Sequence, residues 1–279
     1  MAMATPDEPV TERIVVAVDA SAASRLALEL AADLAAALGT RLTGLYVEEE
    51  GLLHAAGLPF VRSIGAQSGR PTPFTPDELE RQWRALAARA RDTLAQVARA
   101  RQLDWSFEVT RGPAGEVLRA AARGARLMGL GISERPSALM AQAALRLIGT
   151  PLLLAPSRHP SGGRWVAVVD TAEDARGVLT LAGSLATLPD PPVLLMTRSM
   201  EGACQDAVQS LAPSLSRVHL PEHSDLRTVI AALRGCAAQG VIVAARSPLG
   251  QSPLLDRLLA GDNWAVLRVS SAGPEPTDA

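Results

Sequence analysis

The sequence contains no lysine, because all 27 of its basic residues are arginine. A Walker-type phosphate loop needs a lysine after its glycine-rich turn, and Schiff-base chemistry needs a lysine amine. This absence excludes P-loop nucleotide hydrolases and enzymes that hold their substrate as an imine.

Cysteines and aromatic residues are also scarce. Cys204 and Cys236 are the only cysteines, and both fall in Ala/Leu-rich helical patterns, which predicts buried, reduced thiols and no disulfide. Aromatic residues make up 3% of the chain, while 48% of its residues are hydrophobic. The core must therefore be built from alanine, leucine and valine, which suits close packing of helices on a sheet.

The chain has neither a strong net charge nor a long apolar run. Its net charge is −2, and the charges are spread along the sequence, so no stretch marks a nucleic-acid surface. No apolar run approaches the ~20 residues of a membrane span, and residues 1–12 are polar and acidic, unlike a signal peptide. We expect a cytoplasmic protein whose partner is a small molecule or a protein, with no nucleic acid and no membrane.

Short apolar runs alternate with amphipathic helical patterns through the first half. Residues 13–19 read as a buried strand, Ser21 is suited to cap the next helix, and Gly39 to end it. A second strand at 40–47 completes a βαβ unit with a right-handed crossover. The pattern then predicts a helix from Thr75, a strand at 105–110, a helix at 113–123, a strand at 126–131, a helix at 137–147 and a strand at 151–155.

A connection at 48–74 is longer than an ordinary loop, which predicts a functional or mobile segment. Its apolar residues are Leu52, Leu53, Leu58, Phe60, Val61 and Ile64. Two interpretations stay open: the segment closes over a ligand or buries a partner face, or it packs on its own domain.

The second half repeats the first. The strand RIVVAVD at 13–19 corresponds to RWVAVVD at 164–170, an offset of 164 − 13 = 151 residues, and the register persists without gaps through Ala35/Ala186. We interpret this match as an internal duplication. The strands predicted for the second copy are 165–169, 193–197, 217–220, 241–245 and 264–269.

The alternation predicts an α/β protein with two tandem, doubly wound, Rossmann-like domains. Each domain is expected to hold a five-stranded parallel sheet flanked by helices. The expected boundaries are 1–158 for the first domain, which carries the insertion at 48–74, then 159–163 for a linker and 164–279 for the second domain.

These segments resemble the universal stress protein family. The likeness rests on IVVAVD at 14–19 followed by Ser21, on GPAGEVL at 112–118, on LMGLG at 127–131 and on PLLLA at 151–155. It covers nearly the whole chain as two modules. It implies an adenine-nucleotide α-hydrolase-like fold and a cytoplasmic stress-response protein, in a family whose members often bind ATP or AMP and often dimerise.

The resemblance also implies a ligand site. In nucleotide-binding members, an aspartate ending the first strand meets adenosine, and a loop G-x-x-G, nine residues, G-[ST] wraps the phosphates, where glycines admit backbone N–H groups. The cofactor-binding residues carried onto this chain are Asp19, Val47, Gly131, Ser133 and Arg135.

Neither copy keeps that loop intact. Residues 131–137 read GISERPS, without the second glycine, and Glu134 would repel phosphate. In the second copy Gly250 and Gly261 enclose ten residues, and Asp262 replaces the hydroxyl residue. The sequence therefore favours the fold more strongly than it favours ATP binding.

No spacing indicates catalysis or a metal. His219 and His223 are four residues apart, but Pro221 between them predicts a surface loop and no metal pair. No catalytic Ser/His/Asp or Cys/His arrangement is recognisable.

Three functions remain open. The first is a non-enzymatic regulator whose two modules pair as a pseudo-dimer, with homodimerisation also open, and which acts through an unidentified protein partner. The second is an ATP- or AMP-binding regulator, at most a slow ATP hydrolase, that uses the first-copy site. The third is an enzyme of a related nucleotide-binding α/β superfamily.

Overall fold

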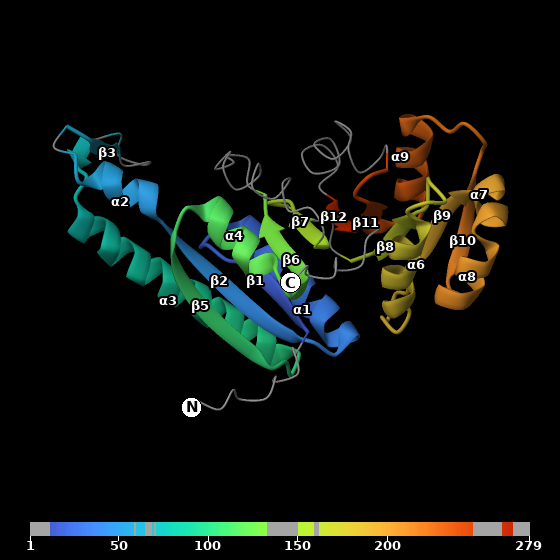
Figure 1. Ribbon diagram of the computed structural model, residues 1–279, viewed down its shortest axis with the longest axis horizontal. Coiled ribbons are helices and arrows are strands. Elements are labelled where there is room, and N and C mark those ends of the chain that lie inside the picture. The colour runs from blue at the N-terminus through green and yellow to red at the C-terminus, as the bar shows by residue number, and fades with distance from the viewer. Residues whose placement is uncertain are drawn as a thin grey trace, which may run out of the picture.

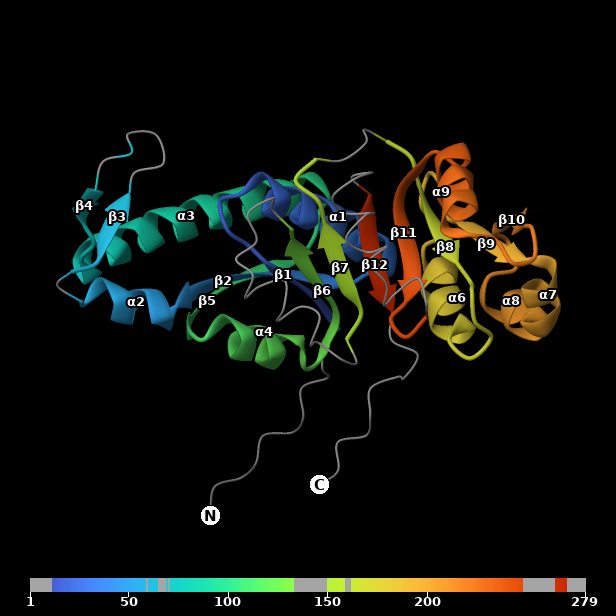
Figure 2. The same cartoon turned by 90° about the horizontal axis from the view of Figure 1, so that it is seen from above.

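The computed structural model describes residues 12–58, 60–64, 69, 71–132, 150–158, 162–247 and 264–269, and shows one ten-stranded sheet covered by helices (Figures 1 and 2). The first-half strands are β1 (Arg13–Ala17), β2 (Arg41–Glu49), β5 (Trp105–Gly112), β6 (Ala125–Gly131) and β7 (Leu152–Ala155). The second-half strands are β8 (Arg164–Val168), β9 (Val193–Thr197), β10 (Ser216–Leu220), β11 (Ala238–Ala244) and β12 (Ala265–Val269).

The strand order is β10-β9-β8-β11-β12-β7-β6-β1-β2-β5. Within each half all neighbouring strands are parallel, and the halves join where β7 and β12 pair antiparallel. Read outward from that junction, both halves have the order fifth, fourth, first, second, third strand. The predicted α/β class with doubly wound parallel sheets is confirmed.

Helices cover both faces of the sheet. One apolar cluster holds residues of α1 (Ala22–Leu38), α3 (Pro76–Ala100), α6 (Ala175–Ser184) and α8 (Gln205–Leu211). The other cluster holds residues of α4 (Ala114–Ala122) and α9 (Leu226–Gly235). The short α7 (Arg198–Ala203) precedes α8, and these two short helices stand in the second half where the first half has the long α3.

Local sequence explains where the long helices begin and end. The Ser21 side chain accepts a hydrogen bond from the Ser24 N–H at 3.1 Å, and Gly39 ends α1 in the left-handed region at φ 63°. Thr75 caps α3, accepting from the Glu78 N–H at 3.4 Å, and Pro76 occupies the first turn. These predicted helix ends are confirmed, whereas the helix expected at 137–147 lies outside the described residues.

The connection at 48–74 is more ordered than an ordinary loop. β2 runs on to Glu49, α2 (Glu50–Ala56) follows directly, and β3 (Arg62–Ile64) pairs antiparallel with β4 (Pro71–Pro73). Glu50 in the first turn and His54 in the last turn of α2 both suit the helix dipole. We call the described residues between 50 and 73 the projecting arm, because in Figures 1 and 2 they lie beyond the end of the sheet, beside the start of α3.

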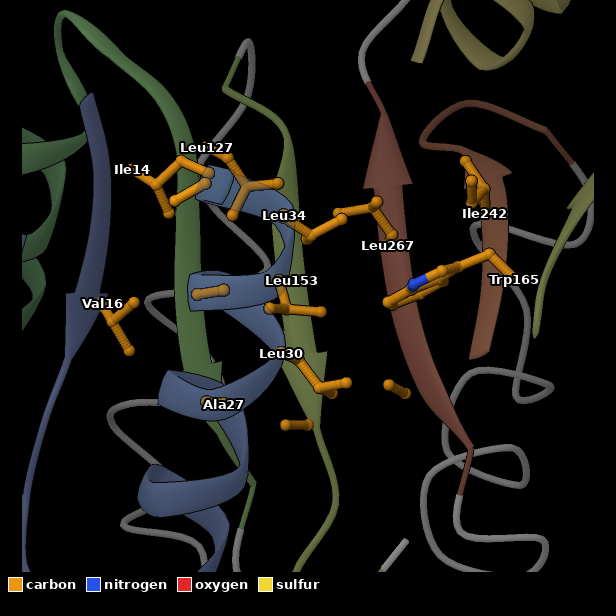
Figure 3. Packing of buried hydrophobic residues seen from close by; sticks show 14 of the residues in the cluster. Ile14, Val16, Ala27, Leu30, Leu34, Leu127, Leu153, Trp165, Ile242 and Leu267 are labelled. Carbon is orange, nitrogen blue, oxygen red and sulfur yellow. The ribbon is translucent and has the colours of Figure 1, made fainter. Parts of the chain in front are cut away.

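The two halves share one core across their junction. Leu153 of β7 lies opposite Leu267 of β12, and both side chains are fully buried. Figure 3 shows Leu267 between Leu34 of α1 on one side and Trp165 on the other. A Cβ on Gly240 would lie 2.5 Å from the Trp165 ring, so the glycine lets that large side chain pack flat against β11.

Both cysteines are free thiols. Cys204 is buried between α7 and α8, as expected, and burial raises the pKa of its thiol. Cys236 is only half-buried, which corrects the prediction, because it follows the last turn of α9 and packs against the edge of the apolar cluster.

Candidate functional site

The carboxyl ends of β1, β2 and β6 meet at one edge of the first-half sheet. β1 lies between β2 and β6, so the direction of winding reverses beside it, and open α/β sheets place ligands at such a point. Ala17 is level with Leu45 and with Leu130, which brings Asp19, Val47 and Gly131 to the same edge. Ser133 and Arg135, the other two predicted site residues, lie outside the described residues.

Asp19 is exposed and shapes the start of α1. Its Oδ1 accepts a hydrogen bond from the Ser21 N–H at 2.8 Å, and its own N–H donates to Ser24 Oγ at 2.9 Å. The carboxylate thus stabilises the turn before the helix. A contact with adenosine stays a prediction.

Gly131 serves close packing. A Cβ at this position would lie 2.3 Å from the Ser24 nitrogen and 2.4 Å from the Ala23 carbonyl carbon. The end of β6 therefore lies directly against the first turn of α1, and only glycine permits that approach. This contact gives Gly131 a structural role whatever ligand the edge takes.

Negative charge gathers at this edge. Tyr46 is buried, and its pKa is raised to about 12, first by burial, then by the nearby carboxylates of Glu48 and Asp19. Arg111 offsets part of this charge: its Nε donates to Glu48 at 2.9 Å, and its guanidinium carbon lies 5.6 Å from the centre of the Trp83 ring. A phosphate group approaching Tyr46 would meet carboxylates on two strands.

The N-terminus of α4 is capped by the Glu49 side chain from β2. The Oε2 of Glu49 accepts a hydrogen bond from the Ala114 N–H at 2.8 Å, at the first residue of the helix. Pro113 precedes it and supplies no side-chain cap. Since free N–H groups at a helix start are a common place for an anion, Glu49 occupies a position that a ligand phosphate could otherwise take.

Sequence reasoning missed the role of Glu49. The connection predicted at 48–74 included Glu48 and Glu49, but both belong to β2. Their partners, Arg111 and Ala114, are 63 and 65 residues away along the chain, so no local pattern could reveal these contacts.

In the second half, the edge strand β10 carries an ion cluster. His219 Nε2 lies 2.6 Å from Glu201 Oε2, and Arg217 Nη1 lies 2.8 Å from Glu201 Oε1. Histidine and arginine together lower the pKa of the Glu201 carboxyl, the hydrogen bond from His219 contributing most. Among the described residues, no three metal-ligand side chains gather in a group. Nor does that part of the chain contain a helix long and apolar enough to cross a membrane.

The projecting arm exposes large apolar side chains. Phe60 is 75% exposed and Ile64 is 70% exposed, and Leu52 and Leu58 are also exposed. Beyond the arm, the exposed large hydrophobic residues of the described chain are Val109 and Val218, on the two edge strands. Among the described residues of the first half, exposed apolar side chains are thus concentrated on the arm.

The fold and this edge define a doubly wound α/β protein of Rossmann type. Residues 11–138 match the model of the universal stress protein family, so the first half of the chain contains a domain similar to that family. No curated protein matches the chain.

Solved structures resemble this chain at low identity, and the one that aligns over nearly the whole chain shares its fold. A universal stress protein from Archaeoglobus fulgidus DSM 4304 is 12% identical, with a TM-score of 0.66 over 94% of this chain and 99% of that one. A family member from Burkholderia pseudomallei is 23% identical over 54% of this chain and 99% of its own, with a TM-score of 0.37. A universal stress protein in complex with cAMP is 18% identical over 53% and 98%, with a TM-score of 0.36.

Proposed function

We propose that this chain is a non-catalytic universal-stress-type regulator of the cytoplasm that acts through protein contacts. The observation that carries the proposal is the apolar surface of the projecting arm, with Phe60 75% and Ile64 70% exposed. A large exposed apolar patch on a soluble fold marks a contact surface. In this proposal the two halves, paired through β7 and β12, take the place of a dimer of single domains.

The proposal also holds that the chain binds nucleotide weakly or not at all. Its support is the carboxylates around Tyr46, the Glu49 carboxylate at the start of α4, and the packing role of Gly131. A second candidate, a regulator that binds ATP or AMP at the first-half edge, is favoured by one observation. Asp19 is exposed at the carboxyl end of β1, at the point where winding reverses.

The arm is tested by a double substitution, Phe60→Ser with Ile64→Ser. Because both side chains are exposed, the fold should be unaffected, while contacts made by the arm should be lost. The matched control is Val218→Ser, which removes an exposed apolar side chain from the opposite edge of the sheet. The measurements are self-association by analytical ultracentrifugation and cross-linking in cells through a photoreactive residue at position 52.

We expect the double variant to lose the associated or cross-linked species that the parent and the control retain. Identical association and cross-linking in all three proteins would contradict a contact role for the arm. Deleting residues 57–71, which removes β3 and the first residue of β4, gives the same test without the paired strands.

A further inference from the structure

A groove runs between α3 and β5, away from the candidate site. Its volume is about 540 Å³, and its walls are Ala87, Ala88 and Arg91 of α3 and Trp105, Phe107 and Val109 of β5. The two alanines are short, which leaves space beside the aromatic rings. Trp105 and Phe107 are half-buried against the core, and Val109 is 50% exposed.

The open wall of this groove is an unpaired strand edge. Among the described strands, β5 is the last of the ten-stranded sheet and pairs with β2 alone (Figure 1). The Leu42 N–H donates to the Asp104 carbonyl at 3.0 Å, so the backbone groups of Asp104 point toward β2. Since these directions alternate, the N–H and C=O groups of Trp105, Phe107 and Val109 point outward. Such an edge can accept another extended strand.

The groove carries a positive charge. Within the described residues Arg91 forms no ion pair, whereas Arg111 pairs with Glu48 and Glu108 pairs with Arg13. None of the side chains that line the groove is acidic. A two-fold dimer through this edge would bring a second Arg91 and no acid, so the charge favours a different occupant.

We propose that the groove between α3 and β5 binds an extended acidic peptide that adds a strand to β5. The peptide backbone pairs with the outward groups of Trp105, Phe107 and Val109, an acidic side chain contacts Arg91, and an apolar side chain on the same face covers the aromatic rings. The inference rests on the proposed function in assigning protein contacts to this chain, and it adds a second surface and the class of its partner.

The test uses the full chain and a fluorescent eight-residue peptide in which valine alternates with glutamate, with blocked ends. Two matched peptides replace glutamate by lysine or methylate alternate backbone nitrogens. Binding is measured by fluorescence anisotropy at low salt. Arg91→Glu reverses the groove charge, and Arg89→Glu makes the same change two residues earlier on α3, outside the groove lining. Val109→Pro removes an outward N–H while sparing the pairing with β2.

We expect the acidic peptide to bind and the lysine and methylated peptides to bind at least tenfold more weakly. Arg91→Glu and Val109→Pro should each weaken binding tenfold or more, and Arg89→Glu should stay within twofold of the parent. The variant carrying Phe60→Ser and Ile64→Ser should bind the peptide normally, so that failure of the arm and failure of the groove are distinguishable.

Three results would overturn the inference. One is no saturable binding of the acidic peptide, and another is equal binding of the acidic and lysine peptides. The third is a dimer in analytical ultracentrifugation that Val109→Pro abolishes, because a second copy of the chain would then pair with the edge of β5. Circular dichroism of each variant confirms that the loss of binding is not a loss of fold.

Discussion

At the scale of single residues, Tyr46 reports most directly on the candidate site. It is the only tyrosine of the chain, it is buried, and its hydroxyl lies near the carboxylates of Glu48 and Asp19. Burial and these two negative charges all disfavour the tyrosinate form. Its ionisation therefore measures the charge at the carboxyl edge without interference from another phenol.

Titration of Tyr46 should have its midpoint near pH 12 instead of pH 10. The folded state holds the phenol proton more tightly than the unfolded state, so the stabilising contribution is complete below pH 10 and is lost as the pH rises toward 12. The loss amounts to about 2 to 3 kcal/mol. Absorbance at the tyrosinate band follows the ionisation, and urea unfolding of the parent and of Tyr46→Phe at each pH follows the stability. A midpoint at the ordinary value would contradict the burial and charge assigned to this edge.

At the scale of elements, the sequence predicted the helix ends that depend on contacts between residues close together in the chain. Ser21, Gly39 and Thr75 each mark a helix end through one short-range contact or one backbone angle, and the structure places all three as expected. α2 escaped notice because seven residues are too short for an apolar period to show, and it follows β2 without a turn. β3 and β4 escaped notice because each has three residues.

The candidate site was predictable only in part, for the same reason. The alternation of strands and helices was enough to bring Asp19, Val47 and Gly131 to one edge of the sheet. The pairing of Glu49 with Ala114 depends on tertiary packing, and so does the close contact of Gly131 with the first turn of α1. Neither leaves a pattern in nearby sequence.

The packing of β6 on α1 predicts the effect of Gly131→Ala. The added Cβ would lie within 2.4 Å of backbone atoms of Ala23 and Ser24, which cannot rotate away, so strand or helix must shift. We expect the free energy of unfolding to fall by about 3 kcal/mol. Gly202→Ala is the matched control, because a Cβ there meets no atom within 4 Å, and alanine favours the helix. Equal stability of the two variants in urea unfolding would show that β6 and α1 are not in close contact.

At the scale of the whole molecule, the antiparallel pairing of β7 with β12 makes one sheet from two modules. Leu153 and Leu267 are fully buried in a cluster that also contains Leu34 and Trp165 (Figure 3). A core shared in this way couples the stability of the two halves, so we expect them to unfold together.

Leu267→Ala should therefore lower a single thermal transition of the whole chain. Removing this buried side chain should cost about 3 kcal/mol, whereas Val218→Ala, on the exposed edge strand β10, should cost less than about 0.5 kcal/mol. Differential scanning calorimetry supplies the test, with the calorimetric enthalpy equal to the van't Hoff enthalpy in the parent and both variants. Two separate transitions, of which Leu267→Ala moves one, would mean that the halves are independent.

The central proposal is that this protein works through protein contacts and binds nucleotide weakly or not at all. Calorimetric titration of the full chain with ATP, ADP and AMP, each with and without magnesium, tests it most directly, beside the variant Asp19→Ala. The account predicts no saturable heat up to about 1 mM nucleotide, in the parent or in the variant. Binding near micromolar, about −8 kcal/mol, that is lost in Asp19→Ala would contradict it and would establish a working nucleotide site at the carboxyl end of β1.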